Sequence, residues 1–379
     1  ARQLPGESES ITIAREGALS PFEPMRVDVP ELGTMPPGLY RVTGTLRIDQ
    51  SEREITARFA VLSSELAARP REQIPHWVGM MPFLNLLPQD RYAPGFALMD
   101  LMGVRHVRFL PGWGRIEPFE GQYDWREADH FVDLCEKHGI TAMFCLSYYG
   151  PAWTVAKSKG QRAYTPEGRA LWVERFAVPT IARYGDRVKE YQIWNEPDAF
   201  WDDDPAKARG FAAHFGTPAN YFDLVKRTHA AAHALGIDGI KVMASLSSGN
   251  QVHNIRRLFD MGLDEFFDGI IIHTYGNHYL HLERAREILK NRGFPDATIG
   301  SGESGIPTAR PMPAEMLQGT RVATVMLGTA CFENISGVNW FVLTRIAHPM
   351  FGLIDEQFHP QPGTIAYFTV ARQIGRAHV

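Results

Sequence analysis

The stretch VKEYQIWNEP, residues 188–197, decides the fold prediction because it places a buried strand directly before a polar tip. Large β-forming side chains flank Gln192, an alternation that is typical of a strand. Pro197 has no N–H for a strand ladder, so the strand must stop where Asn195 and Glu196 emerge. The stretch therefore predicts a carboxylate positioned at a strand end. A surface glutamate that merely follows a strand is the alternative interpretation.

The remainder of the chain repeats a strand-then-helix pattern from residue 76 onward. Short apolar runs alternate with amphipathic stretches, which favours βα units and a parallel sheet. The predicted strands span 77–81, 106–110, 141–148, 188–195, 241–246, 269–273, 298–303 and 337–343. The predicted helices span 96–103, 126–138, 166–184, 220–235, 253–262, 281–291, 314–334 and 364–375. This pattern predicts an α/β fold, a (β/α)8 TIM barrel over residues 76–379, whose active site lies at the C-terminal strand ends.

A doubly wound open sheet is the competing fold. It is disfavoured because no glycine-rich phosphate fingerprint follows an early strand.

Residues 1–65 have a different pattern, without helical periodicity. Alternating runs at 11–13, 25–29, 39–46 and 55–62 are separated by proline and glycine, which favours antiparallel strands. The segment is similar to the closing strands of an immunoglobulin-like module. Because a complete sandwich needs about seven strands, we expect part of a small β-sandwich and further chain upstream. Residues 66–75 are the predicted linker.

Composition excludes several classes of function. A net charge of −4 over 379 residues, without a basic run, argues against a nucleic-acid partner. No segment is apolar enough to predict a membrane span. Cys135, Cys145 and Cys331 lie in apolar stretches without metal-ligand spacing, so we expect no metal and no cofactor. The chain begins at Ala1 without a signal-type segment, so we expect a removed leader or an excised piece.

Several motifs resemble the clan A glycoside hydrolases. The string WNEP at 194–197 resembles the acid/base motif of that clan. Further similar stretches are WGRIEP (113–118), GQYDW (121–125), HTY (273–275), GVNW (337–340) and GLID (352–355). The similarity covers about residues 77–375, with family 39 nearest and family 5 second. It implies a retaining hydrolase of β-glycosidic bonds that acts on an oligo- or polysaccharide without a cofactor, with Glu196 as acid/base.

The resemblance also implies a second carboxylate on the seventh strand, and Glu303 in IGSGESG (299–305) occupies that position as the nucleophile. Here the chain departs from the family, which often has Trp-x-Thr-Glu. Glycosidic cleavage requires two carboxylates because one protonates the leaving oxygen while the other faces the anomeric carbon. We therefore expect a raised pKa for Glu196 and an ionised Glu303. A solvated loop carboxylate is the alternative interpretation of Glu303.

Four further polar residues are candidates for substrate binding. Arg108 and Tyr275 are expected to donate hydrogen bonds that keep Glu303 ionised, and His273 is expected to line the sugar site. Asn195 has an amide that suits a sugar 2-hydroxyl. An ion pair deep in the barrel is the alternative for Arg108, and a structural role is the alternative for His273.

Aromatic residues at strand ends are expected to pack against sugar rings. Trp340 resembles the platform tryptophan of the clan, and we expect the same function of Trp113, Tyr148 and Trp153. Core packing is the alternative for any one of them. By contrast, Glu117 is expected to be a structural loop residue.

Two different classes of function remain open. One is a carbohydrate-binding barrel without turnover, which would retain the aromatic residues. The other is a metal-dependent barrel hydrolase, which would need a His-x-His motif on the first strand, and residues 77–80 have none.

Overall fold

The computed structural model describes residues 35–48, 51–147, 150–157, 165–199, 201, 217–247, 251–306, 313–346, 348, 350–355 and 358–374. Within these residues, eight parallel strands close into one barrel, each hydrogen-bonded to the next along the chain and the last to the first. They are β3 (Val78–Met81), β4 (His106–Phe109), β5 (Thr141–Leu146), β6 (Glu190–Ile193), β7 (Lys241–Leu246), β8 (Gly269–His273), β9 (Thr298–Ser304) and β10 (Ile335–Phe341). The predicted (β/α)8 barrel and its eight strands are confirmed.

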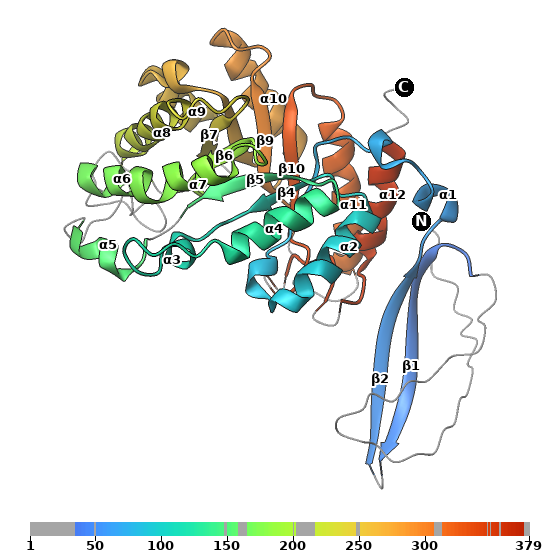
Figure 1. The fold of residues 1–379 in the computed structure, drawn as a ribbon. Coiled ribbons are helices and arrows are strands. Elements are labelled where there is room, and N and C mark those ends of the chain that lie inside the picture. Colours follow the sequence, from blue (N-terminus) through green and yellow to red (C-terminus); the bar gives the residue numbers. More distant parts are fainter. Residues whose placement is uncertain are drawn as a thin grey trace.

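Helices surround the barrel on the outside (Figure 1). They are α1 (Ser64–Ala67), α2 (Tyr92–Met102), α3 (Trp113–Ile116), α4 (Arg126–Lys137), α5 (Ala152–Lys157), α6 (Pro166–Trp172), α7 (Val178–Tyr184), α8 (Pro218–His233), α9 (Gln251–Asp260), α10 (His278–Asn291), α11 (Pro313–Thr329) and α12 (Pro362–Ile374). A π-helical turn at Val173–Ala177 separates α6 from α7, so the predicted helix 166–184 is one path with an irregular centre.

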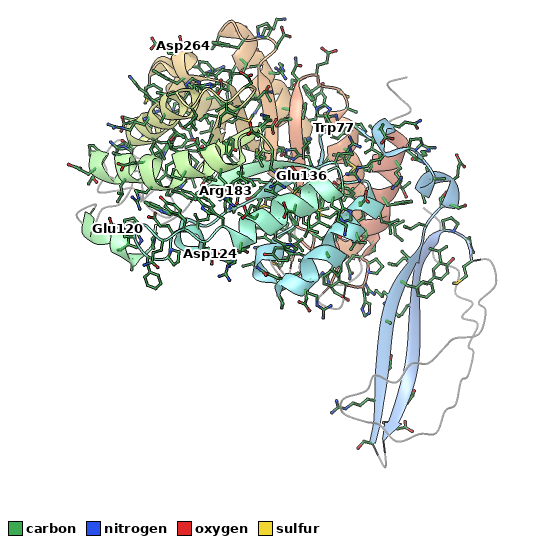
Figure 2. All side chains as sticks on the ribbon, viewed as in Figure 1. Trp77, Glu120, Asp124, Glu136, Arg183 and Asp264 are labelled. Atoms are coloured by element: carbon green, nitrogen blue, oxygen red, sulfur yellow. The ribbon has the colours of Figure 1, made fainter. Side chains whose placement is uncertain are left out.

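Side chains fill the layer between helices and strands, and polar ones link neighbouring helices at its outer edge (Figure 2). Arg183 on α7 donates two hydrogen bonds of 2.9 and 2.6 Å to Asp129 on α4. Its guanidinium also lies 5.3 Å from the ring centre of Trp125. Such contacts fix the spacing of neighbouring helices around the barrel.

The barrel interior is partly polar, which is unusual for the inward face of a buried strand. His106 lies 3.1 Å from Asn339 and 3.4 Å from Glu190, so one imidazole connects β4, β6 and β10. A separate apolar cluster consists of Met143, Met243 and Ile271. Because side chains alternate along a strand, the inward position after His106 is Arg108 and the one after Glu190 is Gln192. Both lie toward the C-terminal strand ends.

The N-terminal part of the described chain is an antiparallel hairpin of β1 (Gly38–Ile48) and β2 (Ser51–Val61), which projects away from the barrel in Figure 1. Arg58 donates a 2.7 Å hydrogen bond to Gln361 and so ties the hairpin to the barrel. The expected strands at 11–13 and 25–29 lie outside the described residues. The predicted domain boundaries and the sandwich assignment therefore stay predictions.

The predicted linker, residues 66–75, is bound to the barrel over much of its length. It contains part of α1 and a 3₁₀ turn at Arg71–Gln73. Arg372 on α12 donates to the carbonyl oxygens of Leu66, Ala67 and Arg69 at 3.2–3.3 Å. Among the described helices, none combines the length and the apolar character that crossing a lipid bilayer requires.

A buried hydrogen bond links the last helix to the first strand of the barrel. The buried Tyr367 hydroxyl on α12 donates to the Gly79 carbonyl oxygen at 2.7 Å. We expect Tyr367→Phe to lower the free energy of unfolding by about 1–3 kcal/mol, because the buried carbonyl loses its donor while the ring packing is kept. Urea denaturation measures this, and Tyr279→Phe on the exposed side of α10 is the control. Equal stability of both variants would contradict the assigned bond.

Candidate active site

Two carboxylates meet at the C-terminal ends of the barrel strands. Glu196 follows β6 and Glu303 lies near the end of β9. One oxygen from each and one ring nitrogen of His273, at the end of β8, all lie within 4.8 Å of one another. The Glu303 side chain is 9% exposed and that of Glu196 is 24% exposed. The structure therefore brings together three of the residues predicted from sequence.

A β-bulge in β9 aims Glu303 into the barrel. Ile272 pairs with Ser301, but the next residue, His273, pairs with Glu303. The pairing of β9 with β10 has the same irregularity: Val338 pairs with Ser301 and Trp340 with Ser304, so β9 has one residue more than β10 over this stretch. One extra residue reverses the alternation of side chains. Without it, Glu303 would lie on the same face as Ser301, away from the barrel axis.

Gly302 makes this bulge possible by leaving room inside the barrel. A Cβ atom at this position would lie 2.8 Å from Ile271 Cγ2 and 2.9 Å from His273 Nε2. Both distances are shorter than carbon contacts in proteins allow, so the side chains could not keep their positions. The GSGES sequence that departs from the family pattern is therefore explained by local packing.

Arg108 holds Glu303 in place and connects three strands. Its Nη1 donates to Glu303 Oε1 at 2.8 Å, its Nε to Gln192 Oε1 at 2.7 Å and its Nη2 to Asn195 Oδ1 at 2.5 Å. The guanidinium is 0% exposed, so its charge needs the carboxylate as a partner. The prediction that Arg108 donates to Glu303 is confirmed in geometry. The sequence did not lead us to predict Gln192 as a partner of Arg108. Its position two residues after Glu190 was the available signal, because residues two apart on a strand point to the same side.

Tyr275 supplies the second donor to Glu303. Its hydroxyl donates to Glu303 Oε2 at 2.9 Å. Burial and the charge of Glu303 raise the pKa of Tyr275 far above its ordinary value, so the hydroxyl keeps its proton. Glu303 thus accepts one hydrogen bond on each oxygen, from Arg108 and from Tyr275.

His273 contacts the other carboxylate. Its Nδ1 lies 2.8 Å from Glu196 Oε1 and 3.5 Å from Glu303 Oε2, so the imidazole is close to both. Burial of Glu196 acts to raise its pKa, but the hydrogen bond and charge of His273 and the charge of Arg108 together lower it below the ordinary value. This corrects the expectation of a raised pKa in the substrate-free protein. The cause is a histidine contact that the sequence did not predict.

The loop that carries Glu196 is held in an unusual conformation. Trp194 has φ 66° and Glu196 has φ 47°, in the left-handed region that residues other than glycine rarely adopt. Such conformations persist where surrounding contacts hold them. One of these contacts comes from Asp198, a buried residue that sequence reasoning missed: it accepts from Ser247 N at 2.6 Å and from Asn254 Nδ2 at 2.7 Å. An acidic residue directly after the NEP turn was the available signal.

Trp340 does not face the carboxylates. Asn339, its neighbour on β10, points inward and bonds His106 and the carbonyl of Ser301. Because side chains alternate along a strand, Trp340 points toward the helices, where it is 2% exposed in the main apolar core. The inward aromatic is Phe341, whose ring centre lies 6.1 Å from that of Tyr275. Phe341, and not Trp340, is therefore the aromatic residue of β10 that lies beside Tyr275.

Trp113 on α3 and Trp153 on α5 pack against each other. Trp113 is 3% exposed, stacks on Phe176 at 5.8 Å and donates from Nε1 to Glu117 at 2.9 Å. The Trp153 ring meets Trp113 edge-on at 5.9 Å. Within the described contacts, neither tryptophan reaches the carboxylate pair, which places Trp113 in the core. Tyr148 lies outside the described residues.

Glu117 has the structural role expected from the sequence. Fully buried, it accepts from Trp113, from the backbone N–H of Gly121 at 2.8 Å and from Arg175. It therefore ties down the loop after α3.

The convergence of Glu196, His273 and Glu303 would suit a metal ion by ligand type alone. The Arg108 guanidinium, 2.8 Å from Glu303, disfavours a second positive charge at this place. The chemistry offered by the group is proton transfer and charge stabilisation.

Parts of the chain are similar to known β-glycosidases. The family model of β-galactosidases of glycoside hydrolase family 42 matches residues 85–185. The aryl-phospho-β-D-glucosidase of Bacillus subtilis (strain 168) is 30% identical over 111 residues, 28% of this chain and 23% of that protein. The β-galactosidase of Halorubrum lacusprofundi is 28% identical over 93 residues, 24% of this chain and 13% of that protein. The matched stretch thus spans less than a quarter of either relative.

A solved family 39 glycoside hydrolase of Bacteroides cellulosilyticus WH2 has the same fold. It superposes with a TM-score of 0.70 and 21% identity, over 89% of this chain and 71% of that one. Together with the family model, this confirms the resemblance to the clan A glycoside hydrolases.

The bulge in β9 can be tested through Gly302. We expect Gly302→Ala to lower the free energy of unfolding by about 1–3 kcal/mol, because the added methyl group overpacks Ile271 and His273. Gly319→Ala is the matched control, since a Cβ there lies at an ordinary 3.5 Å from Ala366 on α12. Urea denaturation of both variants measures the difference. A Gly302→Ala variant as stable as the Gly319→Ala variant would show that Ile271 and His273 do not pack tightly against Gly302.

Proposed function

We propose that this chain is a retaining glycoside hydrolase that cleaves β-glycosidic bonds of an oligo- or polysaccharide, with Glu303 as nucleophile and Glu196 as acid/base. The observation that carries the proposal is the convergence of oxygens from both carboxylates within 4.8 Å at the barrel mouth. Retaining enzymes keep the two carboxyl groups about 5–5.5 Å apart, whereas inverting enzymes need ~6.5–9.5 Å to admit a water molecule. The short separation supports direct attack by one carboxylate.

In the first step, Glu303 attacks the anomeric carbon and forms a glycosyl ester while Glu196 protonates the leaving oxygen. Arg108 and Tyr275 support this role, because each donates a hydrogen bond to one oxygen of Glu303. They also fix its position, so little reorganisation is needed at the moment of attack.

In the second step, Glu196 removes a proton from water, and the water attacks the anomeric carbon from the face that the first leaving group occupied. The bond between this carbon and Glu303 breaks and releases the Glu303 carboxylate. The change of role follows from charge. Formation of the ester removes the negative charge of Glu303 and so favours the deprotonated form of Glu196. His273, which contacts both carboxylates, is positioned to stabilise that form.

The sugar-binding part of the proposal rests on Asn195 and Phe341. Arg108 binds Asn195 Oδ1, which orients the amide and directs its nitrogen elsewhere. That nitrogen is a donor for a hydroxyl next to the anomeric carbon. Phe341 is partly exposed and lies beside Tyr275, so its ring suits the apolar face of a sugar.

The β-configuration of the substrate is supported by the two relatives, an aryl-phospho-β-D-glucosidase and a β-galactosidase. Because these relatives differ in their sugar, a panel of aryl β-glycosides is the suitable first substrate set.

Azide rescue distinguishes the two carboxylates. We expect Glu303→Ala to lose hydrolysis of aryl β-glycosides and azide to restore turnover, giving a glycosyl azide of inverted configuration, because azide attacks from the face left by Glu303. We expect Glu196→Ala to slow turnover by about 10²–10⁴-fold, with azide giving a retained product. Product configuration is read by nuclear magnetic resonance.

The wild-type chain and a Glu120→Gln variant on an exposed loop are the controls. A wild-type chain that binds glycans but cleaves no member of the panel would favour a carbohydrate-binding barrel. Exchange of the two product configurations would reverse the assigned roles.

The pH profile tests the contact between His273 and Glu196. Glu196 acts as an acid only when protonated, so kcat/KM falls as pH rises through its pKa in the free enzyme. His273 lowers that pKa. We therefore expect His273→Phe to move the basic limb of the kcat/KM profile to higher pH, because burial still raises the pKa of Glu196 and only the charge of Arg108 is left to lower it.

His278→Gln is the matched control, since the buried His278 bonds Thr274 and Thr329 and burial lowers its pKa to about 3. Its basic limb should stay in place. A limb that moves to lower pH in His273→Phe would overturn the assigned role of His273.

A further inference from the structure

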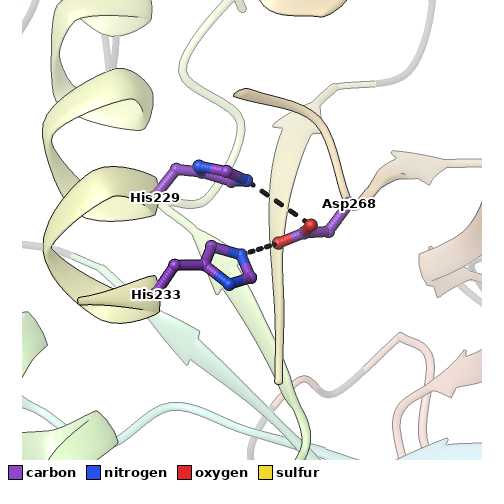
Figure 3. Close-up of side chains that lie close together, drawn as sticks. All are labelled: His229, His233 and Asp268. Carbon is purple, nitrogen blue, oxygen red and sulfur yellow. Dashed lines mark hydrogen bonds and ion pairs between the residues drawn. The ribbon is translucent and has the colours of Figure 1, made fainter. Parts of the chain in front are cut away.

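A second group of side chains converges at the opposite end of the barrel from the carboxylates. His229 and His233 lie one turn apart on α8, and Asp268 directly precedes β8 (Figure 3). His233 Nε2 lies 2.8 Å from Asp268 Oδ2 and His229 Nε2 lies 3.4 Å from Asp268 Oδ1. The three ligand atoms all lie within 4.8 Å of one another.

We propose that His229, His233 and Asp268 form a binding site for a divalent transition metal, with Zn²⁺ as the best-fitting ion. Imidazole nitrogen and carboxylate oxygen are ligands that Zn²⁺ accepts, at bond lengths of about 2.0–2.2 Å. Tetrahedral geometry at these lengths separates neighbouring ligand atoms by about 3.4 Å. The distances from the Asp268 oxygens to the two ring nitrogens, 2.8 and 3.4 Å, are close to that value.

Charge also favours a metal over a simple ion pair. The two imidazole rings lie only 4.3 Å apart between centres, so two protonated rings would repel each other. Both rings direct the same type of nitrogen, Nε2, toward one carboxylate. His233 is 40% exposed, whereas His229 and Asp268 are 17% and 20% exposed. The site is therefore open on one side, which allows a water molecule as fourth ligand.

The metal would stabilise the barrel without joining the reaction. Asp268 Oδ2 also accepts from Val242 N at 2.8 Å, at the start of β7. An ion bound here connects α8 to β7 and β8. Asp268 and His273 flank the length of β8, and five residues of strand span roughly 16 Å. The site is thus separate from the carboxylate pair.

The test is a calorimetric titration of the chelator-treated full chain with ZnSO₄. We expect one Zn²⁺ per chain and a higher melting temperature with Zn²⁺ than without. Removing a ligand by His233→Gln or His229→Gln should weaken binding by at least about 10–100-fold and abolish the thermal shift. His233 is the more exposed of the two, so at least that variant is expected to fold.

Two controls separate this site from other ligands. His253→Gln removes an exposed histidine on α9 and should bind Zn²⁺ like the wild type. Glu303→Gln changes the other converging group and should also leave the affinity unchanged. Absence of Zn²⁺ binding by the wild type, or undiminished affinity in His233→Gln, overturns the proposal.

Discussion

The guanidinium group of Arg108 is the interaction on which the functional geometry depends. It is a buried charge at the end of β4, and each of its nitrogens donates to a side chain from another strand. The partners on β6 and in its following loop, Gln192 and Asn195, and the carboxylate on β9 are therefore held in one plane. A buried arginine that lost its carboxylate would leave an uncompensated charge in the barrel. The same contacts that position Glu303 thus also stabilise the closed sheet.

The irregularities of the barrel lie where this geometry requires them. A regular β9 would direct Glu303 outward, and the extra residue at the bulge turns it toward Arg108. The left-handed residues Trp194 and Glu196 have the same effect after β6, because they bring the second carboxylate out of the strand direction and toward His273. The regular strands form the barrel, and the bulge and the left-handed residues determine where the two carboxylates point.

Much of this arrangement was predictable from the sequence, for identifiable reasons. The repeated strand-helix pattern predicts a closed barrel, and closure implies that residues at the C-terminal strand ends converge. Arg108, Glu196 and Glu303 could therefore be placed together before any coordinates. Side-chain direction was harder, because it depends on the alternation within each strand. Trp340 has the expected residue type, but its side chain points toward the helices. Asn339 points into the barrel, so the alternation along β10 makes Phe341 the next inward residue. The lowered pKa of Glu196 follows from a 2.8 Å contact that sequence patterns do not encode.

The first barrel strand, β3, pairs with the last one, β10, and its Gly79 also bonds Tyr367 on the last helix. These contacts cannot form until the last part of the barrel has been synthesised. The first barrel strand emerges early, but its partner is translated only after all the other barrel strands. Until then, the nascent sheet has an unpaired strand edge that is open to wrong partners. Contacts between distant parts of a chain also slow folding, since a long loop must close before they form. Productive folding of this barrel therefore depends on shielding that early edge while the ribosome completes the chain.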